Sequence, residues 1–319
     1  MVRRLSLIIL VVAAACGGAS KPVQTAPLPD EPKPAPPAAA EAKPTPPPAK
    51  PGPVELKIPA VQTTVKVVSG GKGKKAALRY SARPGTKQAV ELAMDFAGKQ
   101  DTDEQIVPTI VLTGEAETKT VDKDGNAEYE ITVTGVDARP VSGSSVPVDK
   151  FKLVLGTLAG LTIGGKLGST GVAGEVTLRL DSAPSQAADA LALLRVTLPT
   201  LPVLPSEALG LGAKWQSTTT AKLADRLDVT QVTDYELVAH QGTTWTIKGK
   251  TKVSGKDQAI ESSKISSITG TGTSETTIAD GTLYPTHKAS LETQFMASEQ
   301  DKSIRFAIKV GSAVTPRTP

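Results

Sequence analysis

Residues 90–96 read VELAMDF, and the alternation in this stretch decides the fold class. Apolar side chains recur at every second position: Val90, Leu92, Met94 and Phe96. The acidic residues Glu91 and Asp95 stand between them. Successive side chains of an extended chain point to opposite faces, so this stretch has one apolar and one polar face. Such a pattern is typical of a strand in an antiparallel sheet that covers a core on one side.

The same period of two returns in residues 129–133 (YEITV), 176–181 (VTLRLD), 243–253 (TTWTIKGKTKV) and 304–310 (IRFAIKV). In the third of these stretches, Trp245, Ile247 and Val253 share the apolar face, opposite a row of lysines. Turn signals such as Asp-Gly-Asn at 124–126 separate the strands. We therefore predict an all-β, mainly antiparallel fold over residues 54–315, formed as a curved sheet or a barrel-like meander.

One segment departs from this pattern. Residues 182–196 (SAPSQAADALALLRV) place apolar side chains at helical spacing: Ala187, Ala190, Leu191 and Leu194. With Ser182 as a candidate N-cap and Pro184 in the first turn, we predict one short helix near residues 184–196. Residues 198–205 (LPTLPVLP) then predict an extended crossover. Helix and crossover divide the domain into possible halves, 54–183 and 206–315, whose Gly/Thr-rich hairpins suggest that the two are similar.

The N-terminus has the composition of an export signal. Two arginines precede the eleven residues Leu5 to Ala15, which are almost entirely apolar. This length fits a signal peptide and is too short to span about 30 Å of hydrocarbon. The run ends in Ala-Ala-Ala-Cys-Gly, which resembles the bacterial lipobox, although leucine is more usual at Ala13. The resemblance implies cleavage between Ala15 and Cys16, and attachment of diacylglycerol and a further acyl chain such as palmitate to Cys16.

Lipidation also accounts for the single cysteine of the chain. The alternative is ordinary secretion, because Ala13 and Ala15 also satisfy the A-x-A rule of a non-lipid signal peptidase. That route leaves an unpaired thiol in an oxidising compartment. We therefore expect a signal peptide at residues 1–15 and a lipidated N-terminus at residues 16–20.

Residues 21–53 are dominated by proline and hold thirteen of the twenty-five prolines in the chain. Proline fixes φ and lacks an N–H, so the segment favours extended polyproline II over a packed core. Its lysines and acidic residues nearly balance, which argues against a polybasic strip for anionic lipid. We interpret the segment as a disordered tether that spaces the domain from the membrane. A Pro-x-x-Pro ligand for an aromatic groove is the alternative.

The second half of the chain carries a family likeness. Residues 204–220 (LPSEALGLGAKWQSTTT) and 234–247 (DYELVAHQGTTWTI) resemble a family of uncharacterised β-rich bacterial envelope lipoproteins. The shared features are a proline-bounded leucine stretch, Gly-x-x-Trp at Gly212 to Trp215, and a strand with Tyr235. The resemblance implies an envelope location and a β fold, and it implies no activity. Gly17, in place of an Asp after the cysteine, is compatible with outer-membrane sorting in some bacteria, so we expect an anchor in the outer membrane with the domain in the periplasm or at the surface. The expected architecture is also similar to half-barrel lipoprotein carriers, in which a helix lies against an apolar concavity.

Three short motifs match chemical sites incompletely. Residues 160–166 (GLTIGGK) fit GxxxxGK, but Leu167 replaces the Ser or Thr that binds magnesium in a P-loop. Residues 121–130 (VDKDGNAEYE) are similar to a calcium loop, but Ile131 stands where the bidentate Glu belongs. Residues 69–72 match S-x-x-K within a Gly/Lys-rich loop that has no companion motif. We interpret all three as turns and predict neither a cofactor nor a metal site.

The two histidines, His240 and His287, are the remaining candidates for catalysis. Neither has a second histidine or a cysteine at ligand spacing, so we do not expect a zinc site. A Ser–His–acid triad has no fixed order along the chain, and a hydrolase that uses one of these histidines is a third hypothesis. Because the chain has no nucleophile-elbow motif, we predict a protein that is not an enzyme and has no catalytic residue.

Composition narrows the classes of ligand. The formal net charge is +4, or +2 without Arg3 and Arg4, which gives no argument for nucleic acid. Aromatic residues make up 3% of the chain, too few for an exposed stacking platform. An aliphatic inner face beneath an apolar helix and crossover favours non-catalytic binding of a hydrophobic or amphiphilic ligand. The alternative is a structural or protein-interaction role at the envelope, through sheet edges or Thr/Lys-rich outer faces.

Overall fold

The computed structural model describes residues 52–183, 187–223, 226–300 and 302–317. Most of these residues lie in antiparallel strands, so the predicted all-β fold is confirmed. The expected signal peptide, Cys16 and the proline-rich segment up to Pro51 lie outside the described residues. Within the described ranges, no helix is both long and apolar enough to cross a membrane.

Two meanders supply most of the strands. The first meander comprises β4 (Lys87–Gln100), β6 (Thr109–Val121), β7 (Ala127–Arg139), β8 (Thr162–Leu167) and β9 (Ala173–Ala183). The second comprises β11 (Lys214–Leu223), β12 (Leu227–Gln241), β13 (Thr244–Ser254), β15 (Ser263–Ala279), β16 (Thr286–Glu299) and β17 (Lys302–Arg317). The last strand, β17, pairs with β4, so both meanders belong to one sheet.

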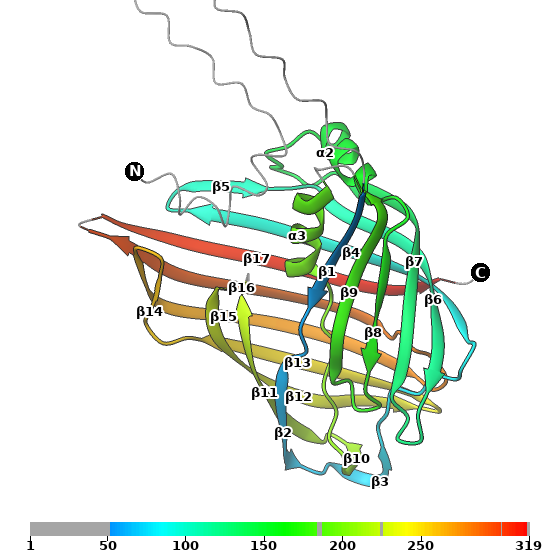
Figure 1. Cartoon of the computed structure of the whole chain (residues 1–319). Helices are drawn as coiled ribbons and strands as arrows, with labels where there is room; N and C mark the ends of the chain where they lie inside the picture. Colours follow the sequence, from blue (N-terminus) through cyan, green and yellow to red (C-terminus); the bar gives the residue numbers. More distant parts are fainter. Residues whose placement is uncertain (1–51, 184–186, 224–225, 301, 318–319) are drawn as a thin grey trace, which may run out of the picture.

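Four shorter strands complete the sheets. They are β3 (Lys72–Ala77), β5 (Asp103–Ile106), β10 (Ala208–Leu211) and β14 (Gln258–Ile260). Strand β5 pairs with the C-terminal end of β4, and β14 pairs with β15. Strands β3 and β10 form a separate two-stranded sheet. This small sheet lies at the lower end of the molecule in Figure 1.

The large sheet is so strongly curled that one N-terminal segment, residues 52–69, supplies the strand at each of its two edges. Strand β1 (Gly52–Ile58) pairs with β9 at one edge, and β2 (Gln62–Ser69) pairs with β11 at the other. Only the residues Pro59 to Val61 separate β1 from β2 along the chain. The two edges must therefore lie close together, as Figure 1 shows, although β1 and β2 do not pair and the sheet is not closed. We call this gap between the edges the seam.

The inner face of the curled sheet carries the core, as the alternation predicted. The four apolar residues of the opening stretch are all buried: Val90, Leu92, Met94 and Phe96. Glu91 departs from the expected solvated face, because it is only 8% exposed. Its carboxylate lies between the guanidinium groups of Arg139 and Arg317, which tie β4 to β7 and to β17. Contact with these two positive charges offsets the free-energy cost of burying the carboxylate.

The predicted helix is α3 (Ala187–Thr197), and its expected buried stripe of Ala187, Ala190, Leu191 and Leu194 is confirmed. Ser182 lies in β9, so its predicted role as N-cap is wrong. Helix α3 lies inside the curve of the sheet and contacts β1, β4 and β17. Residues 198–205, which we call the Leu-Pro segment, follow it without regular structure, as predicted.

A second helix, α2 (Val148–Leu155), with the short 3-10 turn η2 (Gly156–Leu158), contradicts the prediction of a single helix. In its sequence VDKFKLVL, charged and apolar residues alternate over Lys150 to Leu153, as in a strand, before the apolar pair Val154 and Leu155. The structure instead buries Phe151 and Leu155, four residues apart, and leaves Leu153 79% exposed. Pro147 directly before the helix and Asp149 in its first turn are the helix signals that the sequence does contain.

Candidate functional site

A cavity of about 320 Å³ lies inside the curled sheet, next to the C-terminal end of α3 and beside the seam. Residues from both meanders, from β1 and β2, and from the Leu-Pro segment line it. The cavity exists because the inner face is wide and its side chains are aliphatic or small, with few aromatic rings to fill the space. Its volume falls at the lower end of the range of small-molecule sites, about 300–1,000 Å³.

One wall of the cavity is apolar and comes mainly from the first meander. It consists of Leu92, Ile131, Ile163, Leu167 and Val176, joined by Ile58 of β1. Strands β1, β9, β8 and β7 are neighbours in the sheet, and β6 lies between β7 and β4, so these side chains lie on one face of the sheet. Tyr129 and Tyr284 also line the cavity and meet edge to face, with ring centroids 5.7 Å apart. Their burial raises the pKa of both phenols, which are therefore neutral.

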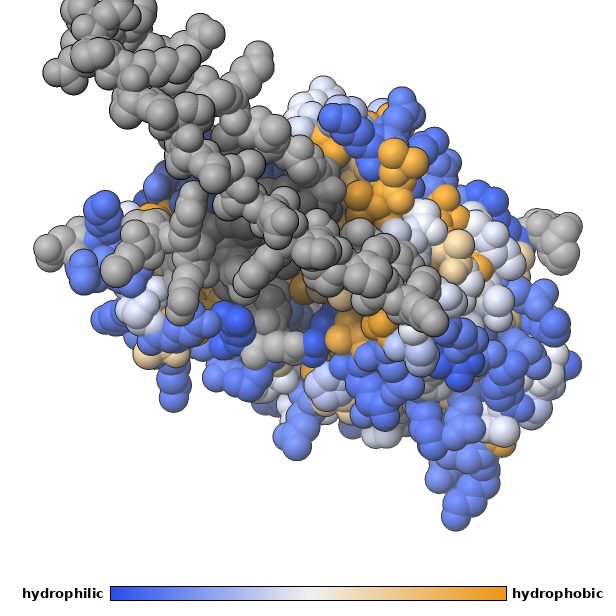
Figure 2. Space-filling model, turned by 45° about the horizontal axis from the view of Figure 1, so that its top comes forward, coloured by the Kyte–Doolittle hydropathy of each residue, from blue (hydrophilic) through white to orange (hydrophobic). Residues whose placement is uncertain are grey.

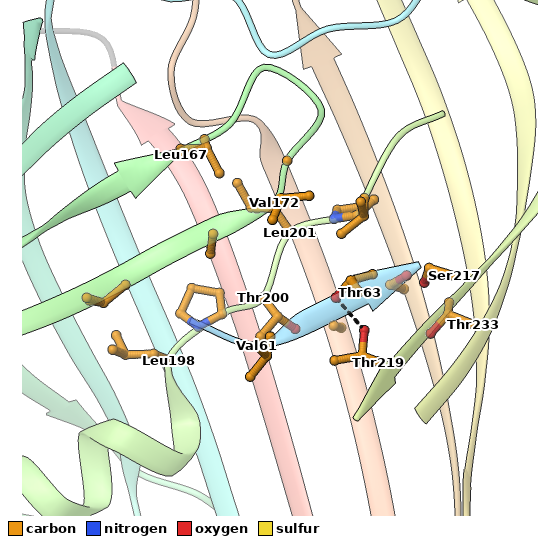
Figure 3. Close-up of a pocket in the computed structure, with 18 of the residues that line it drawn as sticks. Val61, Thr63, Leu167, Val172, Leu198, Thr200, Leu201, Ser217, Thr219 and Thr233 are labelled. Atoms are coloured by element: carbon orange, nitrogen blue, oxygen red, sulfur yellow. Dashed lines mark hydrogen bonds between the residues drawn. The ribbon is translucent and has the colours of Figure 1, made fainter. Parts of the chain in front are cut away.

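The opposite wall is built from hydroxyl groups on β2 and on the second meander, and we call it the hydroxyl wall. Its members are Thr63, Ser217, Thr219, Thr233 and Thr251, with the amide of Gln231 beside them. Thr63 and Thr219 hydroxyls are 2.8 Å apart, and those of Thr233 and Thr251 are 2.9 Å apart. Figure 3 shows the first of these hydrogen bonds and the group of Ser217, Thr219 and Thr233 next to it.

Tyr235 joins the hydroxyl wall to the core. Burial raises the pKa of its phenol, and side-chain hydrogen bonds with Ser217 and Thr233 oppose that rise. The ring stacks on Trp215 with centroids 5.4 Å apart. Gly249 on the neighbouring strand makes room for it, since a Cβ there would lie 2.9 Å from the tyrosine ring. Through Tyr235, the hydroxyl wall is therefore connected to the core.

The Leu-Pro segment lies along the cavity and is tied down at its C-terminal end. The Trp215 indole donates a hydrogen bond of 2.9 Å to the Val203 carbonyl, and the Tyr80 hydroxyl donates one of 2.9 Å to the Pro202 carbonyl. The guanidinium of Arg79 donates to the carbonyls of Pro205 and Ser206. The prolines of the segment have no N–H to donate, so side chains outside the segment donate the hydrogen bonds that these carbonyls accept.

The hairpin between β8 and β9 holds the same segment from the other side. The Leu204 N–H donates to the Thr170 carbonyl at 2.7 Å. Gly171 has φ of +86°, and a Cβ there would lie 2.4 Å from the Pro202 carbonyl oxygen. A glycine is therefore required for the hairpin to approach the segment this closely.

The mouth of the cavity lies at the seam and has an apolar rim. Val61, between β1 and β2, is 40% exposed, and Val172, at the β8–β9 hairpin, is 38% exposed. Both lie near Thr200 and Leu201 of the Leu-Pro segment in Figure 3. Figure 2 shows further hydrophobic residues that interrupt a mostly hydrophilic surface at the end of the molecule that carries α2.

The incomplete motifs all lie in strands or turns. Residues 162–166 of the GxxxxGK match lie in β8, where Lys166 forms an ion pair of 2.7 Å with Glu128. The calcium-like stretch forms the β6–β7 hairpin, and the Asp122 carboxylate accepts hydrogen bonds from Asp124 and Asn126. Ser69 ends β2 and Lys72 begins β3, so the S-x-x-K match is also a turn. Among the residues that the structure describes, no group of three or more His, Cys, Asp or Glu could hold a metal ion.

The two histidines lie in different surroundings, and neither lines the cavity. His240 is exposed on β12 and stacks on Trp245 with centroids 3.4 Å apart. His287 is buried on β16, where its Nδ1 lies 2.8 Å from the Thr276 hydroxyl. Its Nε2 has no hydrogen-bond partner within the described part of the chain. Burial lowers the pKa of His287 to about 4, so the ring is neutral at pH 7.

The sequence predicts a hydrophobic or amphiphilic ligand but no individual residue that binds it. The hydroxyl wall differs from the prediction that the threonine-rich strand faces point outward. Strand parity contains the missing signal. Thr251 is an even number of residues from Ile247 and Val253, which are both buried on the inner face. Thr233 has the same relation to Tyr235 and to Val229.

The Gly-x-x-Trp stretch and Tyr235, which carry the family likeness, meet at this site. Trp215 fixes the Leu-Pro segment, and Tyr235 orders the hydroxyl wall. No protein-family model matches the chain, and a search of curated protein sequences finds no significant match.

Proposed function

We propose that this protein is a lipid-anchored lipoprotein of the bacterial cell envelope whose domain binds a hydrophobic or amphiphilic ligand without changing it chemically. The observation that carries the proposal is the two-sided cavity, with an aliphatic wall facing a hydroxyl wall. A site of this kind buries the apolar part of a ligand, at about 25 cal/mol per Å², and offers hydrogen bonds to its polar part.

The arrangement around the cavity also supports a binding role. A core that served stability alone would be expected to fill a space of this size, because an empty volume destabilises a fold by about 24 cal/mol per Å³ of cavity. Here the hydroxyl network and the tied Leu-Pro segment keep the cavity open. The apolar rim at Val61 and Val172 is a suitable entry for an aliphatic chain.

The leader supports the anchor. After cleavage of a signal peptide that ends at Ala15, the lipid on Cys16 would hold the chain in the membrane, with residues 21–53 as spacer. Two or more acyl chains give a stable anchor where one does not. Replacement of Cys16 by serine keeps the A-x-A pattern at Ala13 and Ala15, so we expect that variant to be exported and released in soluble form.

Native mass spectrometry of the Cys16→Ser chain tests the binding proposal. The chain is exported to the periplasm of a bacterial host and purified without detergent, and its native mass is compared with its denatured mass. We expect an additional mass that is lost on denaturation and is identified as a lipid or another amphiphile. Equal masses in both states, together with failure to take up added amphiphile, would favour the protein-interaction alternative.

Two matched variants place the ligand in the cavity. Ala289 on β16 points inward and lines the cavity, so Ala289→Phe fills the space. Lys288 is the preceding residue and is exposed, so Lys288→Phe adds the same ring outside. We expect the first variant to lose the additional mass and the second to keep it, with both unfolding cooperatively. Retention of the ligand by a folded Ala289→Phe chain would place the ligand elsewhere.

A further inference from the structure

The cavity contains almost no charge. Among the lining residues that the structure describes, Arg195 alone carries a charged side chain. It belongs to α3 rather than to the strands of the hydroxyl wall, and it also makes an interaction within the chain. The acidic and basic side chains of the second meander form pairs on the outer face instead, such as Lys214 with Glu236 and Lys248 with Glu275.

We infer that the ligand is an uncharged, single-chain amphiphile whose hydroxyl or ester oxygens lie against the hydroxyl wall while its aliphatic chain lies against the apolar wall. This inference rests on the proposed function and adds the chemical class of the ligand. It follows from what the two walls can and cannot stabilise.

The hydroxyl wall can bind neutral oxygens. Each serine or threonine hydroxyl has one donor and two acceptor positions. The Thr63–Thr219 pair uses one donor and one acceptor, so it keeps one donor and further acceptor positions for a ligand. Thr233 also shares a hydrogen bond with Tyr235, so the Thr233–Thr251 pair offers a ligand acceptor positions. Ser217 is 4% and Thr233 is 8% exposed, so these groups lie deep in the site rather than at its rim.

The same wall cannot stabilise a charged headgroup. A buried ion without an opposite charge has a desolvation cost of several kcal/mol, which hydroxyl groups offset poorly. Phosphate, carboxylate or quaternary ammonium placed against Thr233 and Thr251 finds no lysine, arginine, aspartate or glutamate on this wall. Hydroxyls, esters and ethers bind without that cost, so the site selects them.

The volume limits the size of the ligand. The cavity is about 320 Å³, at the lower end of the range of small-molecule sites, about 300–1,000 Å³. This space suits one short aliphatic chain with a small headgroup and is too small for a two-chain phospholipid. A monoacylglycerol with an eight-carbon chain is therefore a suitable probe.

Displacement of a neutral fluorescent probe tests the inference. N-phenyl-1-naphthylamine is bound to the Cys16→Ser chain, and three compounds with the same eight-carbon chain compete with it: monooctanoylglycerol, octanoate and octylphosphocholine. We expect monooctanoylglycerol to bind at least about ten-fold more tightly than either charged compound. Equal or tighter binding of octanoate would overturn the inference and assign the headgroup to Arg195.

A pair of variants tests the orientation. Thr233→Val with Thr251→Val removes two wall hydroxyls at nearly constant shape, and Thr220→Val removes an exposed hydroxyl as control. We expect the double variant to bind monooctanoylglycerol more weakly, by about five-fold for each hydroxyl removed, and Thr220→Val to bind it with wild-type affinity. Unchanged affinity for monooctanoylglycerol would contradict the assigned orientation. Failure of the probe and all three competitors to bind would instead contradict the proposed function itself.

Discussion

At the scale of single residues, His287 is the buried titratable group whose charge the fold cannot tolerate. Its Nδ1 is bonded to Thr276, its Nε2 is without a partner in the described structure, and burial lowers its pKa to about 4. In the unfolded chain the ordinary pKa is about 6.5, so the unfolded state binds a proton first as the pH falls. Stability is therefore lost between about pH 6.5 and pH 4.

We predict that this histidine alone removes about 3 kcal/mol of stability between these pH values, since 2.5 pKa units separate the folded and unfolded states. His287→Gln keeps a partner for Thr276 and cannot take up the proton. Urea unfolding at pH 7 and pH 4.5, followed by tryptophan fluorescence, should show a smaller pH-dependent loss in this variant. His240→Gln, which changes an exposed ring, serves as the control and should keep the wild-type pH dependence.

At the scale of elements, the sequence predicts whether a segment forms a strand or a helix better than it predicts which strands pair with each other. The period of two identified the long strands, and the spacing of Ala187, Ala190, Leu191 and Leu194 identified α3, because one buried face dictates each pattern. Helix α2 could not be predicted, because Lys150 to Leu153 alternate like a strand and because the exposed Leu153 does not share a helical face with the buried Phe151 and Leu155. The seam could not be predicted, since the pairing of β1 and β2 with distant strands leaves no local signal.

The candidate site could also be predicted only in part from the sequence. The apolar wall was predictable as the inner face of period-two strands, and the Leu-Pro segment was predictable as a crossover. The hydroxyl wall was not recognised, because a threonine on a strand fits the wet face as well as the inner one, and only parity with buried neighbours distinguishes them.

The anchoring of the Leu-Pro segment gives a prediction at this scale. Trp215→Phe keeps a ring to stack on Tyr235 but loses the hydrogen bond to the Val203 carbonyl. We expect faster amide hydrogen exchange in residues 198–204, and a free energy of unfolding lower by about 1 kcal/mol. Trp245→Phe, which alters the ring stacked on His240, should leave the exchange of this segment unchanged. If Trp215→Phe leaves exchange there at the wild-type rate, the indole does not hold the segment.

At the scale of the whole molecule, the sequence division into halves does not coincide with the sheet. The segment 54–183 contains β2, yet β2 pairs with β11 of the other segment. The segment 206–315 contains most of β17, yet β17 pairs with β4 of the first. Each half therefore completes the sheet of the other, and residues of both halves line the cavity.

We predict that neither fragment, 54–183 or 206–315, folds alone, because each would expose an apolar inner face and unpaired strand edges. The intact Cys16→Ser chain should unfold in one transition, with far-UV circular dichroism and tryptophan fluorescence giving the same midpoint. Each separate fragment should lack a cooperative transition. A sharp thermal transition in either isolated fragment would show that the pairing of β4 with β17 joins two independent domains. The cavity would then be an interface between them rather than the interior of one fold.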